Sequence, residues 1–212
     1  DKDFYHQSAV KVPLIICDPR PAANDTRGNV SDALVEMIDL APTFMDALGC
    51  PPKPHVLEGR NLMPLLHGKD GFSRRYVISE HDYSSFEMAR ALEVPQEDAR
   101  TVMIFDGRWK YIRCEGFRPF LFDLELDPDE LDDIGGSDLQ QHCEARERME
   151  KALMTWSLQH HARITANAEL VSRLPLTAEF GVLIGFWDEA EYEQATGKPF
   201  SSLVPTGPAK VD

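Results

Sequence analysis

The sequence predicts an α/β protein in which a small antiparallel sheet is covered by one long helix. Three observations support this fold class. Residues 12–17 form a short apolar run with β-branched side chains, and four more strand-sized runs lie within residues 76–124, separated by turn signals. From Ser137 onward, the apolar residues follow the spacing of a helix with one apolar face. Short turns between consecutive strands favour antiparallel pairing.

The first 72 residues combine strand and helix patterns. The apolar run at residues 12–17 predicts a buried strand. Residues 34–38 are interpreted either as a second strand or as the beginning of a helix. Asp39 is expected to cap a helix that ends at Gly49. A further short helical turn is predicted at residues 62–67.

The segment 73–162 predicts a subdomain made of a sheet and one helix. Its strand runs are rich in β-branched and aromatic residues, and the dipeptide D-G at residues 106–107 is a hairpin signal between the middle two. The predicted strands are residues 76–79, 101–105, 109–113 and 120–124. One amphipathic helix over about residues 138–161 is expected to cover one face of the sheet, because its apolar side chains recur at helical spacing.

Residues 163–212 predict an extended C-terminal arm. The arm contains the apolar string F-G-V-L-I-G-F-W at residues 180–187, followed by a stretch with Pro and Gly but no periodicity. Phe186 and Trp187 are large aromatic side chains that need cover. We therefore expect the arm to dock on another subunit and to form a homo-oligomer.

Composition narrows the classes of function. The 212 residues include 36 acidic and 22 basic side chains, for a formal net charge of −14, and a field of this sign repels nucleic-acid phosphates. No apolar run is long enough for a membrane span, so neither nucleic acid nor a membrane is an expected partner. The four cysteines form no C-x-x-C pair, which is typical of free thiols in a reducing compartment and predicts a cytoplasmic protein. The first residue is Asp rather than Met, which predicts an excised piece of a longer protein.

Five ordered motifs resemble the sulfatase family of the alkaline phosphatase superfamily. They are Tyr5 followed by K-V-P-L-I-I at 11–16, D-L-A-P-T at 39–43, E-G-R-N-L-M-P-L-L at 58–66, W-K-Y-I at 109–112, and L-F-D-L with D-P-D-E at 121–130. The strings E-H-D-Y-S at 80–84, E-G-F-R-P at 115–119 and G-F-W-D-E at 185–189 resemble the phosphonate monoester hydrolases within that superfamily. The resemblance implies that residues 1–72 are the C-terminal end of a catalytic, alkaline-phosphatase-like α/β domain.

The resemblance also implies the chemistry of the complete protein. Such hydrolases use a formylglycine nucleophile beside a divalent cation (Mn, Ca, Mg or Zn) to cleave small phosphonate, phosphate or sulfate esters. Nearly all of those residues are expected upstream of Asp1, so no metal ligand is predicted in this chain. Lys2 precedes Lys11 by nine residues, near the position of the family's substrate-binding lysine, and is the candidate for binding the substrate oxyanion.

His81 and Cys50 are two further residues whose role in the active site has to be considered. His81, between Glu80 and Asp82, is a candidate for bordering the substrate cleft, although a solvated or supporting histidine is the simpler interpretation. Cys50 begins the string C-P-P-K-P, but Pro54 stands where the family's formylglycine signature C/S-x-P-x-R requires Arg, so Cys50 is rejected as the nucleophile. A different class of function stays open, namely a non-catalytic structural or oligomerisation module.

Overall fold

The computed structural model describes residues 5–160, 169 and 188–203. The chain divides into two compact units, residues 1–165 and residues 166–212. Among the described residues, no helix is both long enough and apolar enough to cross a membrane.

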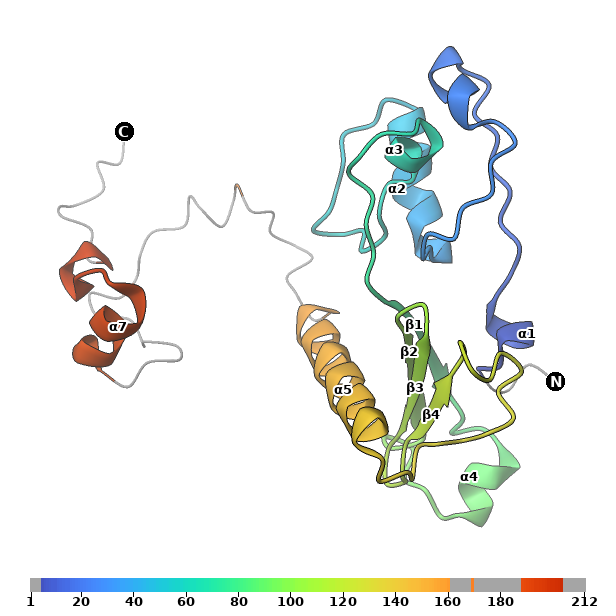
Figure 1. Ribbon diagram of the computed structural model, residues 1–212, viewed down its shortest axis with the longest axis vertical. Coiled ribbons are helices and arrows are strands. Elements are labelled where there is room, and N and C mark those ends of the chain that lie inside the picture. Colours follow the sequence, from blue (N-terminus) through green and yellow to red (C-terminus); the bar gives the residue numbers. More distant parts are fainter. Residues whose placement is uncertain (1–4, 161–168, 170–187, 204–212) are drawn as a thin grey trace. The chain divides into compact units, whose positions relative to one another are not determined.

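The centre of the first unit is the predicted four-stranded antiparallel sheet (Figure 1). Its strands are β1 Val77–Asp82, β2 Arg100–Phe105, β3 Trp109–Cys114 and β4 Phe120–Asp123, in the order β1-β2-β3-β4. The predicted hairpin joins β2 to β3: Gly107 has φ 101°, and the Asp106 carboxylate accepts hydrogen bonds from the amides of Arg108 and Trp109. The helix α4, Glu87–Ala91, lies between β1 and β2 in the sequence. The α/β fold class is confirmed.

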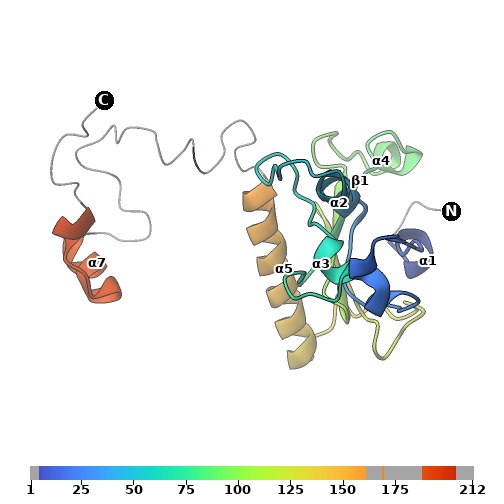
Figure 2. The same ribbon diagram turned by 90° about the horizontal axis from the view of Figure 1, so that it is seen from above.

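The long helix α5, Gln140–His160, covers one face of the sheet as predicted (Figure 2). Met149 and Leu153 are buried against Ile104, Tyr111 and Leu121 of the strands, and Trp156 is packed at the edge of this core. Leu139 precedes the helix and is exposed, so it does not belong to the buried face.

The opposite face of the sheet carries a second, smaller core. Tyr5, Met103, Ile112 and Phe122 are buried together there. The short helix α1, Gln7–Val10, follows Tyr5 directly, and its Val10 packs against the same cluster. Because side chains alternate between faces along a strand, Lys110 lies on the same face as Ile112, whereas Trp109 and Tyr111 face α5.

The prediction of a buried strand at residues 12–17 is wrong for this chain. The segment forms no strand, and Val12 and Ile15 are 55% and 93% exposed. The apolar pattern reports a preference for burial, but a strand also needs a neighbour for its backbone groups, and none of the described residues supplies one.

Short helical elements follow in the first unit. They are η1 Pro21–Thr26, η2 Met37–Asp39, α2 Leu40–Ala47 and α3 Met63–Leu66. Of the two interpretations of residues 34–38, the beginning of a helix is correct, since η2 leads directly into α2. Asp39 precedes α2 as predicted but does not cap it, because its carboxylate accepts hydrogen bonds from the amides of Glu36 and Arg60 instead.

The second unit contains the helix α7, Glu189–Thr196, which the sequence analysis did not predict. Asp188 caps it by accepting a 2.9 Å hydrogen bond from the Glu191 amide, and Gly197 ends it with φ 66°. The turn η3, Phe200–Leu203, follows, and the rings of Tyr192 and Phe200 meet edge to face with centroids 5.9 Å apart. Phe186 and Trp187 lie outside the described residues, so the prediction about their docking stays open.

Candidate functional site

The candidate site begins at Tyr5, the first residue that the structure describes. Lys2 lies outside the described residues, but Tyr5, three residues later, is firmly held. Tyr5 is 4% exposed, and its hydroxyl donates a 2.8 Å hydrogen bond to the Thr101 carbonyl of β2. Burial raises the pKa of Tyr5 to about 12, so the hydroxyl keeps its proton at neutral pH.

His81 lies next to this anchor. It is paired across the strands with Thr101, the residue that receives the Tyr5 hydroxyl, so both side chains belong to the same face of the sheet. The ring of His81 meets Phe86 edge to face at 5.3 Å between centroids. Its Nε2 atom is buried and has no hydrogen-bond partner among the described residues. An unsatisfied buried nitrogen is costly, so this atom is available to a further polar group.

A buried ion pair lies further along the same face. The Lys110 ammonium group donates hydrogen bonds to the Tyr5 carbonyl, at 2.6 Å, and to the carboxylate of Glu130. Glu130 also accepts a 2.6 Å hydrogen bond from the Gln7 amide. Burial lowers the pKa of Lys110, while Glu130 counteracts this by favouring the charged ammonium. This pair was not predicted from the sequence, although a lysine between two aromatic residues in a strand was a usable signal.

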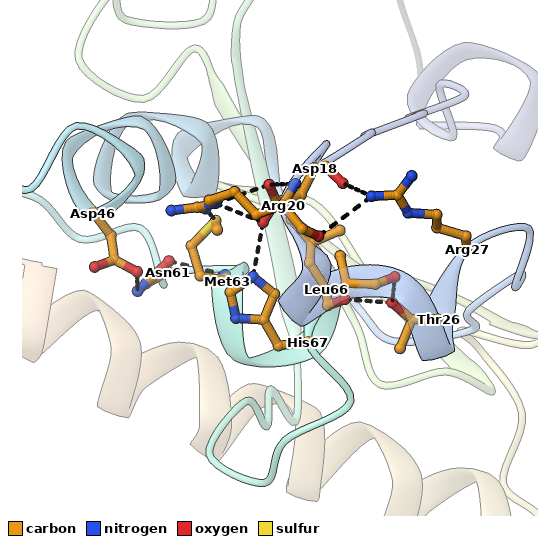
Figure 3. Close-up of polar contacts among 10 residues, drawn as sticks. Asp18, Arg20, Thr26, Arg27, Asp46, Asn61, Met63, Leu66 and His67 are labelled. Atoms are coloured by element: carbon orange, nitrogen blue, oxygen red, sulfur yellow. Dashed lines mark hydrogen bonds and ion pairs between the residues drawn. The ribbon is translucent and has the colours of Figure 1, made fainter.

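A second polar cluster connects the segment after residue 17 to α3 (Figure 3). The buried Asp18 carboxylate accepts hydrogen bonds from Arg20 Nε at 2.9 and 3.0 Å, and its Oδ2 atom lies 2.7 Å from His67 Nε2. Arg27 donates to the Asp18 carbonyl at 3.1 Å. The hydrogen bonds from Arg20, followed by the one with His67, hold the pKa of Asp18 well below its ordinary value. With its carboxylate engaged in this way, Asp18 fixes the loop and is a poor general base.

Two of the sequence motifs meet in the interior. The Asp39 carboxylate accepts a 2.7 Å hydrogen bond from the Arg60 amide, and the Thr43 hydroxyl accepts one of 2.9 Å from the Leu62 amide. A Cβ atom at Gly59 would lie 2.0 Å from the Ile38 carbonyl oxygen, so only glycine fits this approach.

Arg74 completes this buried centre by pairing with both Asp39 and Glu36. The motifs D-L-A-P-T and G-R thus build the fold at this point.

The described residues contain no group of three or more His, Cys, Asp or Glu side chains that could hold a metal ion. All four cysteines are free thiols, and Cys50 is exposed in the loop after α2. The divalent cation implied by the family resemblance therefore stays a prediction, and its ligands are expected outside the described residues.

Residues 1–159 match the family described as N-sulphoglucosamine sulphohydrolase, C-terminal. The chain belongs to this family. Among the relatives of this chain, the multifunctional alkaline phosphatase superfamily protein PehA of Trinickia caryophylli is 29% identical over 163 residues, covering 75% of this chain and 31% of that protein. Arylsulfatase K of Xenopus laevis is 28% identical over 179 residues, covering 81% and 31%.

Two solved structures resemble the fold of this chain. The phosphonate monoester hydrolase of Agrobacterium radiobacter aligns with TM-score 0.51 and 28% identity over 57% of this chain and 24% of that one. The hydrolase SpPMH of Silicibacter pomeroyi aligns with TM-score 0.59 and 23% identity over 66% and 28%, which shows the fold alone. The chain spans about a third of the length of the curated relatives named above.

Proposed function

We propose that this chain is the C-terminal portion of a metal-dependent hydrolase of phosphonate, phosphate or sulfate esters, whose formylglycine nucleophile lies outside the chain. The observation that carries the proposal is the family match over residues 1–159, together with relatives that are named as arylsulfatases or as alkaline phosphatase superfamily proteins. The substrate is a small molecule, and neither nucleic acid nor a membrane takes part.

The exposed apolar segment after α1 supports a larger catalytic body. Ile15 is 93% exposed and Val12 55%, with backbone groups that pair with no described strand. An extended apolar segment of this kind is suited to join a sheet and bury its side chains there. We place the remainder of the hydrolase against this segment, which would then become the buried strand that the sequence pattern indicates.

In the complete enzyme, a divalent cation held by residues outside this chain would supply Lewis-acid activation of the ester and would stabilise negative charge on its oxygens. This chain contributes Lys2, whose ammonium group binds a non-bridging oxygen of the ester as a compact charge. Tyr5, three residues after Lys2 in the sequence, donates a hydrogen bond to Thr101, and His81 is the cross-strand partner of Thr101. The 212-residue chain by itself is expected to bind no catalytic metal tightly.

Steady-state hydrolysis by the complete gene product tests the proposal. We expect turnover of an aryl phosphonate monoester or an aryl sulfate, loss of turnover on chelation, and recovery on adding manganese, calcium, magnesium or zinc. The sequence upstream of Asp1 should contain C-x-P-x-R. If that string is missing and neither ester is hydrolysed, the proposal is wrong. The chain is then better interpreted as a structural or oligomerisation module. We further propose a cytoplasmic homo-oligomer, which fractionation and light scattering can test.

A further inference from the structure

The helix α2 carries an exposed stripe of apolar side chains. Phe44 and Leu48, the residue directly after the helix, are 60% and 80% exposed. Ala41 is also exposed and lies on the same side, because residues three and four apart are neighbours on a helix. Met37 of η2, four residues before Ala41, is 59% exposed and continues the row. We call these four residues the α2 stripe.

The polar contacts of α2 lie on its other side. The buried Thr43 hydroxyl donates a 2.6 Å hydrogen bond to the Asp39 carbonyl and accepts one from the Leu62 amide. The buried Asp39 carboxylate pairs with Arg74. A helix at the surface of a soluble protein normally turns its apolar side toward the core. In α2 the side held by the rest of the chain is the polar one, and the apolar stripe faces outward.

The two hydrophobic cores of the first unit do not include the α2 stripe. One core lies between α5 and the sheet, and the other surrounds Tyr5 on the opposite face. Among the described residues, 11–75 contribute no side chain to either core. An apolar patch that stays exposed on a soluble protein marks a contact with another surface. The apolar side of α2 therefore lacks its packing partner within the described residues.

The length of the related proteins indicates where that partner comes from. The matching family is a C-terminal one, and the match covers 31% of PehA and 31% of arylsulfatase K of Xenopus laevis. Roughly two thirds of each relative's length thus lies outside the match. We propose that the α2 stripe packs against an apolar surface of the part of the hydrolase that precedes this chain, as a second contact beside residues 12–17. This inference rests on the proposed function, in which the chain is the C-terminal portion of a longer enzyme.

Hydroxyl-radical footprinting of the complete gene product tests the proposed contact without any substitution. The chain offers two matched pairs of side chains: Met37 and Met154 are both 59% exposed, and Phe44 and Phe117 are 60% and 49% exposed. We expect oxidation of Met37 and Phe44 to be at least about 10-fold slower than that of Met154 and Phe117, because oxidation follows exposure. In the separate 212-residue chain, the members of each pair should be oxidised at similar rates. Similar rates in the complete product would overturn the inference.

Two further samples distinguish the occupants of the stripe. Protection that disappears when the complete product is diluted until it dissociates into monomers would assign the stripe to a second copy. Protection that disappears on deleting residues 176–212 would assign it to the C-terminal arm, and either result would overturn the inference. Protection in a product that hydrolyses neither ester would keep the contact and refute the proposed chemistry, whereas hydrolysis without protection would refute the contact alone.

A pair of substitutions measures what the contact contributes to stability. Phe44→Asp/Leu48→Asp should lower the melting temperature of the complete protein by at least about 5 °C, because two carboxylates would have to leave water. In the 212-residue chain the same change should shift it by about 2 °C or less, since the positions are exposed there. Met154→Asp/Leu158→Asp is the matched control, with the same spacing near the end of α5 and 59% and 73% exposure. Equal shifts for the two double variants in the complete protein would overturn the inference.

Discussion

The Nε2 atom of His67 lies 2.7 Å from the Oδ2 atom of Asp18, across 49 residues of sequence. This contact joins the exposed segment after α1 to the end of α3 (Figure 3). The same carboxylate also accepts hydrogen bonds from Arg20, two residues later in its own loop. One acidic side chain therefore fixes its own loop and connects it to His67 at the end of α3.

The lowered pKa of Asp18 predicts a loss of stability in acid. A carboxyl group whose pKa is depressed on folding contributes stability above its ordinary pKa of 3.8, and that contribution is lost as the pH falls below this value. Asp18→Asn should therefore lower the free energy of unfolding at pH 7 and flatten its decline between about pH 5 and pH 2. Urea unfolding at a series of pH values checks this, with Asp25→Asn as an acidic control nearby. Parallel curves for wild type and Asp18→Asn would show that Asp18 does not contribute.

Gly59→Ala should be strongly destabilising. Its new Cβ atom would meet the carbonyl carbon and oxygen of Ile38, which are backbone atoms that cannot rotate away. We expect a loss of about 1–3 kcal/mol or more, measured by chemical denaturation. Gly136→Ala is the control, since no atom lies within 4 Å of a Cβ atom at that position. Equal stability of the two variants would refute the close approach.

Arg74 is expected to be essential for the first unit to fold. Its guanidinium group pairs with Asp39 and Glu36, whose side chains are 0% and 16% exposed. Arg74→Met leaves both carboxylates without their buried cation, and removing one partner of such a group typically costs about 3–5 kcal/mol. The neighbouring Arg75 stacks on Tyr76 and forms no ion pair with another described residue, so Arg75→Met should cost about 1 kcal/mol or less. Thermal melts of the two variants would contradict this if they coincided.

The C-terminal arm is predicted to hold subunits together through Phe186 and Trp187. Each aromatic side chain can bury roughly 150–250 Å², which is enough to anchor an extended segment on a neighbour. Deleting residues 176–212 from the complete protein should lower the number of subunits in light scattering. The double substitution Phe186→Ala/Trp187→Ala should do the same while leaving α7 intact. An unchanged mass for both variants would rule out this role.

The sequence predicted the sheet and α5 because both depend on local periodicity. The alternation in β2 and β3, with the hairpin residues Asp106 and Gly107 between them, specifies antiparallel strands without knowledge of distant partners. The prediction at residues 12–17 failed for the opposite reason. Its apolar pattern indicates burial, but none of the described residues supplies a strand that pairs with it.

The polar contacts of the site were harder to predict. Nothing local to Lys110 indicates that its acidic partner is Glu130 or that its second partner is the carbonyl of Tyr5. The same holds for Asp18 and His67, since a hydrogen bond across a long loop depends on the whole fold. Sequence motifs identified these regions, whereas the structure shows which atoms meet.

The substitution Lys2→Ala in the complete enzyme tests the central claim most directly. Loss of a charged donor to an oxyanion typically costs a factor of about 10²–10³ in rate, so turnover of an aryl phosphonate monoester and of an aryl sulfate should collapse. The melting temperature should barely move, and Lys2→Arg should restore part of the activity, because its planar guanidinium keeps the charge in a wider shape. Wild-type turnover in Lys2→Ala would contradict the assignment of Lys2 to the substrate oxyanion.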